Sequence, residues 1–339
     1  MEKINLSKKR ILLNYAIKSR EKITLLCKSY AFFQKRKYQK LHDIVIFPID
    51  LISIMSSYRD VFGGFPNIII PKTFSEWMQW KKTFGRKYFH VACADKINVR
   101  NFVGERIGFE YLPKLLWSGI PSEINTDLIE SFPQEFVIKS SHGSGMTRIV
   151  YDKNNIDIEK LKSETRQWLD TDFSLKHGEW QYRWIKPKIM IEEFLKTRNS
   201  KPPVDYKFYC FNGEIVLCNI HLGRFDIHRN LFFDKEFNML PISNNKNGNF
   251  RIDSSEVITK EMFYELINIS EKLSEGFHFV RVDLYYTDRP YFGELTFTPA
   301  AGLRKFYPEA VDRILGDIYA GKATIEDLYQ IKLTTNDVV

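Results

Sequence analysis

The strongest chemical signal is a set of charged and hydroxyl side chains on two neighbouring predicted strands. The first strand carries Arg281 and Asp283, and the second carries Glu294 and Thr296. Because side chains alternate between the faces of a strand, the two residues of each pair share one face. Facing carboxylates suit Mg²⁺, which takes one or two protein carboxylates together with nucleotide phosphates. A surface network of Arg, Asp and Glu on a hairpin is the alternative interpretation.

A second signal is a lysine at the end of a short apolar strand, followed by a turn of small residues. The strand ends at Lys139, and residues 140–145 read Ser-Ser-His-Gly-Ser-Gly. Small residues let the backbone approach a ligand closely, and consecutive N–H groups can bind phosphate oxygens. The segment matches neither the Walker loop nor the dinucleotide fingerprint. Taken alone, it is more typical of a plain turn of Gly and Ser.

A third segment, residues 188–195, runs from a buried strand into the paired acids Glu192 and Glu193. Backbone groups and a carboxylate there could bind an adenine amino group and a ribose. Two solvated glutamates at a strand end are the alternative, which is favoured without further context.

Mixed helices and strands must position these groups. Strands are predicted at 136–139, 188–195, 206–211, 214–220, 277–286 and 291–297. Asn212-Gly213 is the strongest hairpin signal in the chain. Helices are predicted at 158–169 and 261–273, and another starts at Thr73, where Thr-x-x-Glu predicts a capping box. Residues 95–130 read as helix, loop and helix.

The basic charge is confined to the N-terminus. The 339 residues carry a formal net charge of +8, and residues 1–42 hold twelve Lys or Arg against two Glu, a net of +10. Since the whole chain has 50 basic and 42 acidic residues, the remainder carries 38 and 40. This near-neutral balance argues against a basic groove that binds nucleic acid. Apolar residues at helical spacing between residues 6 and 41 predict basic amphipathic helices, which either pack on the body or dock on an anionic membrane surface.

No segment reads as membrane-spanning. The longest apolar stretch, residues 44–55, is shorter than the ~20 residues of a span, and Pro48 and Asp50 interrupt it. Residues 1–12 lack the apolar core of a secretory signal. Four cysteines without C-x-x-C or zinc-finger spacing predict reduced, buried thiols: Cys27, Cys93, Cys210 and Cys218. We therefore expect a cytoplasmic protein, with peripheral attachment to the inner face of the membrane as an option.

Taken in order, these segments resemble the ATP-grasp fold, most closely the TupA-like branch associated with teichuronopeptide and other surface-polysaccharide synthesis. The similarity covers residues 66–321 and leaves residues 1–65 outside. Five motifs carry it: Ala-Asp-Lys at 94–96, Phe-Val-Ile-Lys and its turn at 136–145, Asp-Tyr-Lys-Phe-Tyr-Cys-Phe-Asn-Gly at 205–213, Val-Arg-Val-Asp-Leu-Tyr at 280–285, and Gly-Glu-Leu-Thr-Phe-Thr-Pro-Ala-Ala-Gly at 293–302. Their order is more specific than any single motif.

The resemblance implies an α/β (α+β) ATP-grasp fold, in which two α/β lobes with antiparallel sheets clasp ATP. A basic helical extension precedes these lobes at the N-terminus. The implied division has five parts. They are the extension at 1–65, an N-terminal lobe at 66–130, a small lid subdomain at 131–195, a C-terminal subdomain with the metal site at 196–322, and a tail at 323–339.

The resemblance also implies how the nucleotide is held. Lys139 would bind the α- and β-phosphates, and Lys207 would be a second phosphate-directed cation. Glu192 and Glu193 would hold the adenosine. The turn that would close over the phosphates as a mobile flap consists of Ser140, Ser141, His142, Gly143, Ser144 and Gly145.

At the metal position, Asp283 and Glu294 would hold Mg²⁺, and Arg281 would steady the acyl phosphate and the oxyanion of the tetrahedral intermediate. Related ligases commonly have Glu-x-Asn at this position, and here Thr296 replaces the Asn. The site could therefore bind either one ion or two. His142, His221 and Arg224 are candidate substrate contacts near the expected cleft, although a lone histidine is more often a packed or exposed side chain.

The implied reaction is ADP-forming carboxylate–amine ligation through an acyl phosphate. The expected carboxylate is a uronic acid of a capsule or cell-wall glycan, and the amine is an amino acid or amino sugar. One rival is a kinase on the same fold that leaves phosphate on a glycan. Another is a non-catalytic membrane-associated assembly protein, although Lys139, Asp283 and Glu294 are all intact and speak against it.

Overall fold

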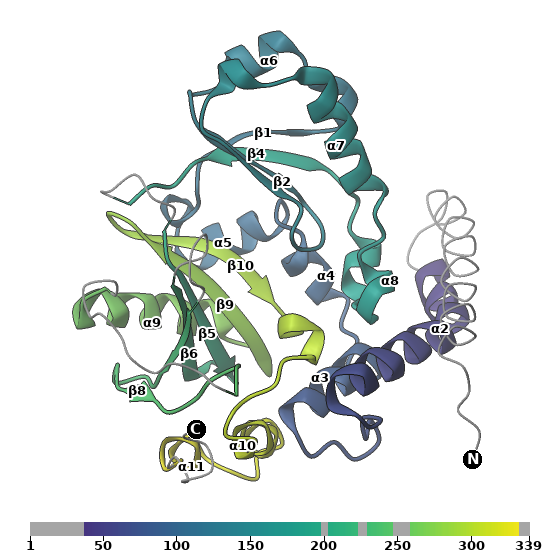
Figure 1. The fold of residues 1–339 in the computed structure, drawn as a ribbon, viewed down its shortest axis with the longest axis vertical. Helices are drawn as coiled ribbons and strands as arrows, with labels where there is room; N and C mark the ends of the chain where they lie inside the picture. The colour runs from purple at the N-terminus through teal and green to yellow at the C-terminus, as the bar shows by residue number, and fades with distance from the viewer. Residues whose placement is uncertain (1–36, 198–202, 223–228, 247–257, 332–339) are drawn as a thin grey trace.

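Two antiparallel sheets organise the part of the chain that the computed structural model describes, residues 37–197, 203–222, 229–246 and 258–331. A smaller lobe holds a four-stranded sheet, and a larger lobe holds a six-stranded sheet (Figure 1). This arrangement confirms the predicted class of two α/β lobes with antiparallel sheets. The helices predicted before residue 37 lie outside the described residues, as do Arg224 and Cys27.

The four-stranded sheet has the order β1-β4-β2-β3. Its strands are β1 (Leu115–Gly119), β2 (Phe136–Ser140), β3 (Thr147–Val150) and β4 (Ile189–Glu193). Helices α6 (Thr126–Glu130) and α7 (Ile158–Asp170) lie on one side of it (Figure 1). Ile138 and Ile191 are buried in the core of this lobe. Alternation therefore places Lys139 and Glu192 on the opposite face.

The six-stranded sheet has the order β10-β9-β5-β6-β7-β8. Its strands are β5 (Asp205–Phe211), β6 (Glu214–Leu222), β7 (Arg229–Phe233), β8 (Met239–Leu240), β9 (Phe279–Tyr286) and β10 (Pro290–Thr296). The predicted hairpin joins β5 to β6, with positive φ at Asn212 (52°) and Gly213 (91°). Both central residues of a type I′ turn need this backbone, which explains the Asn-Gly signal.

Helices pack on both faces of the larger sheet and leave part of one face open. On the first face, α5 (Val99–Ile107) and α9 (Lys260–Ser274) bury Phe208, Val282 and Leu295. On the second face, α3 (Phe74–Thr83) and α10 (Ala310–Tyr319) cover Tyr209 and Phe279. The same face continues past these two helices as one wall of the site described below.

Local sequence signals set several helix ends. The predicted capping box is present: Thr73 Oγ1 accepts from the Glu76 N–H at 3.2 Å, and Glu76 accepts from the Thr73 N–H at 3.3 Å. At α9, the Thr259 hydroxyl caps the Met262 N–H. The remaining helical segments are α4 (Phe89–Ala94), α8 (Ser174–His177), α11 (Ile325–Tyr329), η1 (Phe109–Tyr111), η2 (Pro121–Glu123), η3 (Lys153–Asn155), η4 (Trp180–Trp184) and η6 (Pro299–Gly302).

Helix α2 (Lys37–Phe62) extends far beyond the helical pattern predicted to end near residue 41, and it continues through Pro48. Proline removes one helical hydrogen bond and is expected to break or kink a helix. Tertiary contacts oppose that tendency here. Asp50, fully buried, accepts from Arg183 Nη2 at 2.6 Å and from Arg86 Nη2 at 2.7 Å, which ties the helix to the segments around η4 and α4.

The sequence prediction missed four strands. Residues 95–130 were expected to form helix, loop and helix, but β1 lies between α5 and α6. β3, β7 and β8 were also not predicted. Each of these strands lies at an edge of its sheet or next to one. Pairing with a neighbour, rather than a strong alternating pattern, fixes such short strands.

The chemistry of the cysteines agrees with the prediction. Cys93, Cys210 and Cys218 are buried and unpaired, and burial raises the pKa of each thiol.

None of the helices within the described ranges is both long enough and apolar enough to cross a bilayer.

We expect Asp50→Ala to lower the free energy of unfolding by about 3–5 kcal/mol, because it removes the carboxylate that neutralises the buried Arg183. Urea denaturation measures this change. The control is Asp60→Ala, an exposed acid on the same helix, with an expected change within about 0.5 kcal/mol. Equal stability of the two variants would contradict the anchoring role.

Candidate active site

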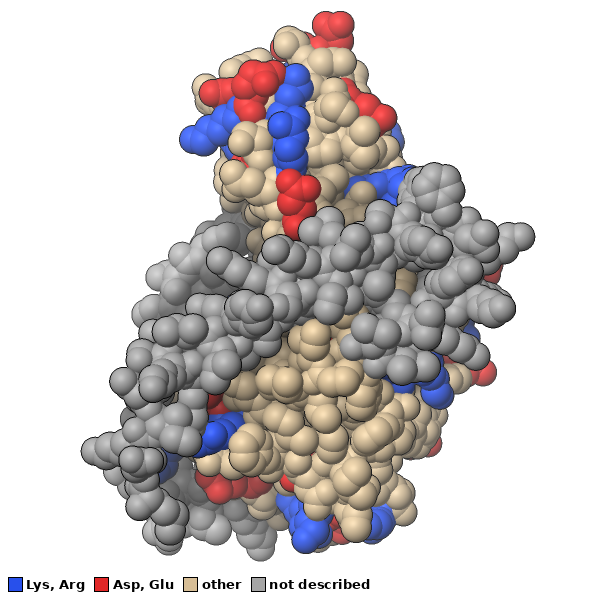
Figure 2. All heavy atoms as spheres, turned by 90° about the vertical axis from the view of Figure 1, so that its right-hand side faces the viewer, with Lys and Arg blue, Asp and Glu red and all other residues tan. Residues whose placement is uncertain are grey.

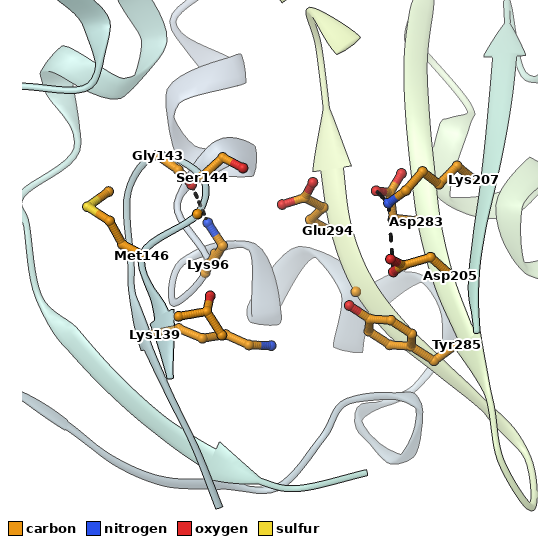
Figure 3. Close-up of a pocket in the computed structure, with 13 residues that line it drawn as sticks. Lys96, Lys139, Gly143, Ser144, Met146, Asp205, Lys207, Asp283, Tyr285 and Glu294 are labelled. Carbon is orange, nitrogen blue, oxygen red and sulfur yellow. Dashed lines mark hydrogen bonds and ion pairs between the residues drawn. The ribbon is translucent and has the colours of Figure 1, made fainter. Parts of the chain in front are cut away.

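The two sheets face each other across a pocket of about 110 Å³. Lys139 and Gly143 line it from the smaller lobe, and Lys207, Asp283 and Glu294 line it from the larger lobe. In Figure 3, Lys139 and Glu294 point into the cavity from opposite sides. The structure therefore brings together the two strongest signals of the sequence, the lysine-tipped strand and the Asp/Glu hairpin.

Strand register places three charged side chains in one row on the cleft face. Lys207 of β5 pairs with Asp283 of β9, which pairs with Glu294 of β10. A bulge at Gly293 sets this alignment, because the register shifts between Phe292 and Glu294. A Cβ at Gly293 would lie 2.9 Å from the carbonyl oxygen of Asp283, so only glycine fits there without displacement. Sequence alternation predicted the facing carboxylates, but not the bulge that aligns them.

Two cations neutralise Asp283, whose side chain is 2% exposed. Arg281 donates from Nε to Oδ1 at 2.6 Å and from Nη2 to Oδ2 at 2.7 Å, and Lys207 Nζ donates to Oδ2 at 2.6 Å. Burial alone would lower the pKa of Arg281, but Asp283 raises it above its usual value. The guanidinium therefore stays charged and holds the carboxylate in place.

Arg281 also links the remaining members of the predicted metal set. Its Nη2 donates to Thr296 Oγ1 at 3.0 Å and to Glu294 Oε1 at 3.3 Å. The Thr296 hydroxyl in turn donates to Glu294 Oε1 at 3.1 Å. Asp283, Glu294 and Thr296 thus surround one guanidinium, and a divalent ion bound there would compete with it for the same oxygens.

Within the described ranges, no three His, Cys, Asp or Glu side chains are close enough to hold a metal by themselves. The two carboxylates Asp283 and Glu294 still fit Mg²⁺, which commonly binds one or two protein carboxylates and completes its shell with phosphate oxygens and water. The donor set of this pocket is therefore compatible with an ion that shares phosphate ligands, and it does not form a closed protein cage.

Glu192 and Glu193 have different environments. Glu192 forms an ion pair with Lys139 and lines a recess of about 20 Å³ beside the main pocket. Arg100 and Met190 line the same recess. Glu193 lines neither cavity, and its carboxylate accepts from the Lys114 N–H at 2.7 Å. Of the two acids predicted to hold adenosine, Glu192 is the one that the structure places at the cleft.

Only part of the predicted flap borders the main pocket. Ser140, Ser141 and His142 are buried. The His142 Nδ1 atom lies 2.7 Å from Ser140 Oγ, and Ser141 Oγ accepts from the Lys188 N–H at 3.0 Å. From this turn and the residues that follow it, five residues line the main pocket: Gly143, Ser144, Gly145, Met146 and Thr147. Positive φ values of 72° at Gly143 and 80° at Gly145 explain the two glycines.

A larger cavity of about 450 Å³ adjoins the pocket of about 110 Å³, because Ser144, Asp205, Lys207 and Glu294 line both. His221, one of the predicted substrate contacts, lines this larger cavity. Further lining residues, none of them predicted, include Lys176, Glu179, Tyr182 and Arg304. Burial raises the pKa of Glu179, although its carboxylate accepts from Thr298 Oγ1 at 2.7 Å.

The wall of the larger cavity contains strained backbone. Ala300, Ala301 and Gly302 have φ values of 47°, 56° and 66°, a left-handed run that costs energy for the two alanines. Lys82 Nζ donates to the Ala301 carbonyl at 2.9 Å, and Gln79 Nε2 donates to the Gly302 carbonyl at 2.8 Å. Buried side chains of α3 therefore hold this turn, and nothing in the local sequence predicts it.

Lys96 is a further pocket residue that sequence reasoning did not assign. It follows α4, and its Nζ donates to the Gly143 carbonyl at 2.6 Å (Figure 3). Burial lowers the pKa of Lys96, and Glu294 opposes this shift. Asp205 and Tyr285 also line the pocket without an assigned role. All three lie in motifs that carry the resemblance, so their place in those motifs was the available signal.

We expect Lys96→Met to loosen the turn at Gly143, because it removes a charge-assisted hydrogen bond worth about 1.5–3 kcal/mol. Amide hydrogen exchange of residues 143–147 should rise about tenfold or more, since local opening becomes easier. Lys114→Met serves as the control because Lys114 is exposed and lines no part of the pocket. Unchanged exchange in Lys96→Met would show that the contact does not restrain the turn.

Comparisons with known proteins give relatives of low identity. Solved structures that are similar include D-alanine–D-alanine ligase from Bacillus anthracis, at 18% identity and a TM-score of 0.36, over 68% of this chain and 70% of that one. The ATP-grasp ligase PsnB, complexed with a phosphomimetic precursor variant, Mg and ADP, has 12% identity and a TM-score of 0.37, over 74% and 66%. D-cycloserine synthetase DcsG has 12% identity and a TM-score of 0.33, over 73% and 86%.

No curated protein sequence matches the chain. The sequence profile described as TupA-like ATPgrasp matches residues 76–320, well over half of the chain. This span contains both sheets and every described residue that lines the pocket between them. The chain therefore belongs to the TupA-like ATP-grasp family.

Proposed function

We propose that this protein is an ATP-dependent, Mg²⁺-using ligase that activates a carboxylate as an acyl phosphate and joins it to an amine. The observation that carries the proposal is the convergence of Lys139, Lys207, Asp283 and Glu294 on one pocket that opens into a larger cavity. Membership of the TupA-like ATP-grasp family supports the use of ATP.

The pocket offers cations on both sides for a triphosphate. Lys96 and Lys139 would bind phosphate oxygens beside the Gly143 turn, and Lys207 would bind them from the larger sheet. Lysine acts as a point charge toward phosphate, so three lysines from different segments suit an extended anion. Glu192, beside the recess that Met190 and Arg100 line, would contact the nucleoside.

Asp283 and Glu294 would hold Mg²⁺, with Thr296 as a neutral oxygen nearby. The ion would neutralise negative charge on the nucleotide phosphates while the terminal phosphoryl group passes to the carboxylate. Lys207 and Arg281 hold Asp283 in position, and they would contact phosphate oxygens when an ion takes their place on the carboxylate. The number of ions depends on Thr296, because its side chain is shorter than the Asn side chain of related ligases and its hydroxyl reaches less far toward a second ion.

The larger cavity would hold the substrates of ligation. A carboxylate oxygen attacks the terminal phosphorus, and ADP leaves. An amine then attacks the acyl carbon, the bond from that carbon to the phosphate oxygen breaks, and the proton lost by the amine passes to the departing phosphate. Arg281 lies between the pocket and the cavity and would stabilise the oxyanion of that second step. Lys176 and Arg304 would bind the anionic substrate, and Glu179 gives the cavity an anionic contact for an ammonium group.

The proposed carboxylate is a uronic acid of a bacterial capsule or cell-surface polysaccharide, and the proposed amine is an amino acid or amino sugar. The association of the TupA-like branch with surface polysaccharides supports this class. The proposed place of action is the cytoplasmic side of the membrane, which the net charge of +10 in residues 1–42 supports.

Asp283→Asn should lower Mg²⁺-dependent ATP turnover by at least about 100-fold, because it removes one of the two carboxylates available to the ion. The measurement is ADP release with and without Mg²⁺, together with calorimetric binding of a non-hydrolysable ATP analogue. Asp288→Asn, an exposed acid at the turn of the same hairpin, is the matched control and should keep full turnover.

Glu294→Gln provides a second variant that leaves the buried contacts of Asp283 with Arg281 and Lys207 in place. Its turnover should fall in the same direction. Full ATP turnover in both Asp283→Asn and Glu294→Gln would remove the metal assignment.

Hydroxylamine distinguishes ligation from simple phosphorylation without knowledge of the natural amine, because it converts an acyl phosphate into a stable hydroxamate. With ATP, Mg²⁺, a glucuronic-acid oligosaccharide and hydroxylamine, we expect hydroxamate, ADP and free phosphate in equal amounts. Mass spectrometry and a phosphate assay measure these products, and the Asp283→Asn protein is the negative control.

A stable phosphorylated oligosaccharide with no hydroxamate would identify a kinase and reject the ligase. Hydroxamate formed only with carboxylates other than uronic acids would keep the ligase and reject the proposed substrate class.

A further inference from the structure

Residues 63–72, which join α2 to α3, expose an unusual amount of apolar surface. Phe65, Ile69 and Ile70 are 65%, 73% and 65% exposed, the three highest values among large hydrophobic side chains in the described part of the chain. Scattered exposed apolar residues are ordinary, but three within six positions form a cluster. We call residues 63–72 the apolar loop.

Hydrogen bonds fix the shape of the apolar loop. Asn67 Oδ1 accepts from the N–H groups of Ile69 at 3.2 Å and Ile70 at 2.9 Å. The Glu76 carboxylate accepts from the N–H groups of Asn67 at 2.9 Å and Lys72 at 2.8 Å. The backbone therefore cannot turn the two isoleucines inward without breaking these bonds.

Three buried residues anchor the same loop to the body of the protein. Pro66, Ile68 and Pro71 are buried, and they alternate with the exposed side chains. A chain that only needed a polar connection between two helices would not expose Ile69 and Ile70 next to these anchors. The loop is thus a rigid support that presents a small apolar cluster to its surroundings.

One cation contacts the cluster, and another contacts Phe62, the last residue of α2 before the loop. The Arg59 guanidinium carbon lies 5.4 Å from the centroid of the Phe65 ring, and Lys305 Nζ lies 5.9 Å from that of Phe62. Lys72 is exposed at the end of the loop. Among the nearby acids, Glu76 uses its carboxylate on backbone N–H groups, whereas Asp60 is exposed on α2. On the face that Figure 2 shows, broad areas without charged side chains lie below the grey atoms, and Lys, Arg, Asp and Glu side chains lie together at the lower edge.

We propose that the apolar loop inserts Phe65, Ile69 and Ile70 into the headgroup region of an anionic lipid membrane, with Arg59, Lys72 and Lys305 on lipid phosphates. Three side chains are too few for a stable protein interface, which needs about 800 Å² from each partner. They suit an interfacial anchor, which combines shallow apolar burial with attraction to anionic lipids. A single weak anchor is rarely enough, and residues 1–42 with a net charge of +10 supply a second signal in the same chain.

The test is flotation of the full-length protein with vesicles of phosphatidylglycerol and phosphatidylcholine, in low salt and in 0.5 M salt (about a 4 Å screening length). The variant is Phe65→Ser/Ile69→Ser/Ile70→Ser, which changes no charge. We expect its vesicle partition to fall about tenfold or more at both salt concentrations, since apolar insertion is not screened. Phe109→Ser/Ile120→Ser, at two other exposed sites (61% and 47%), is the matched control and should partition as the wild type does.

An Ile69→Trp reporter gives an independent readout. Its fluorescence should shift to shorter wavelength with the anionic vesicles and should be quenched by brominated lipid chains. Equal partition of the triple Ser variant and the wild type, or a reporter that brominated lipids do not quench, would overturn the proposal. Light scattering that shows a wild-type dimer lost in the triple variant, with unchanged lipid binding, would overturn it in favour of a second copy of the chain.

Discussion

The burial of one carboxylate, Asp283, on the cleft face of the larger sheet is the constraint on which the rest of the site depends. An ionised group at that depth is stable only when opposite charges and hydrogen bonds surround it. Arg281 on the same strand and Lys207 on the next one supply them. Strand register delivers both partners, and the Gly293 bulge brings Glu294 into the same row. The hairpin, the bulge and the β5 pairing are therefore parts of one electrostatic arrangement.

The two faces of the larger sheet explain why the cleft lies where it does. α5 and α9 pack on the apolar face, whereas α3 and α10 cover only part of the other. α3 serves the cleft as well, because Gln79 and Lys82 hold the left-handed turn at Ala301. Burial lowers the pKa of Lys82 to about 8, and Glu179 and Asp50 oppose this shift. The same buried side chains of α3 therefore take part in the packing of the helix on the sheet and in the shape of the larger cavity.

The sequence predicted those features that local rules determine. Alternation placed Arg281, Asp283, Glu294 and Thr296 on one face, and Asn212-Gly213 located the β5–β6 turn. The same alternation would have separated Glu192 from Glu193, since adjacent strand residues point to opposite faces. The prediction nevertheless assigned both to the nucleoside.

Features that depend on distant residues could not be predicted in this way. α2 crosses Pro48 because Asp50 meets Arg183, 133 positions away in the sequence. Lys96 reaches the turn at Gly143, and Glu179 joins the cavity through Thr298, across 47 and 119 positions. A single lysine or glutamate carries no local sign of such a contact. The charge of the N-terminal segment could be read from the sequence, whereas residues 1–36 lie outside the described ranges.

The distribution of charge between the two sides of the pocket argues for the kind of ligand that it can hold. Three lysines and three carboxylates line it: Lys96, Lys139, Lys207, Asp205, Asp283 and Glu294. The smaller lobe and Lys96 contribute two of the lysines and none of the carboxylates, whereas the larger sheet contributes all three carboxylates together with Lys207. A simple anion would be attracted by the lysines but would leave the carboxylates without a cationic ligand, and a bare metal ion would be attracted by the carboxylates but repelled by the lysines. A polyphosphate with its divalent ion satisfies both sides at once, because its oxygens meet the lysines while its metal meets the carboxylates.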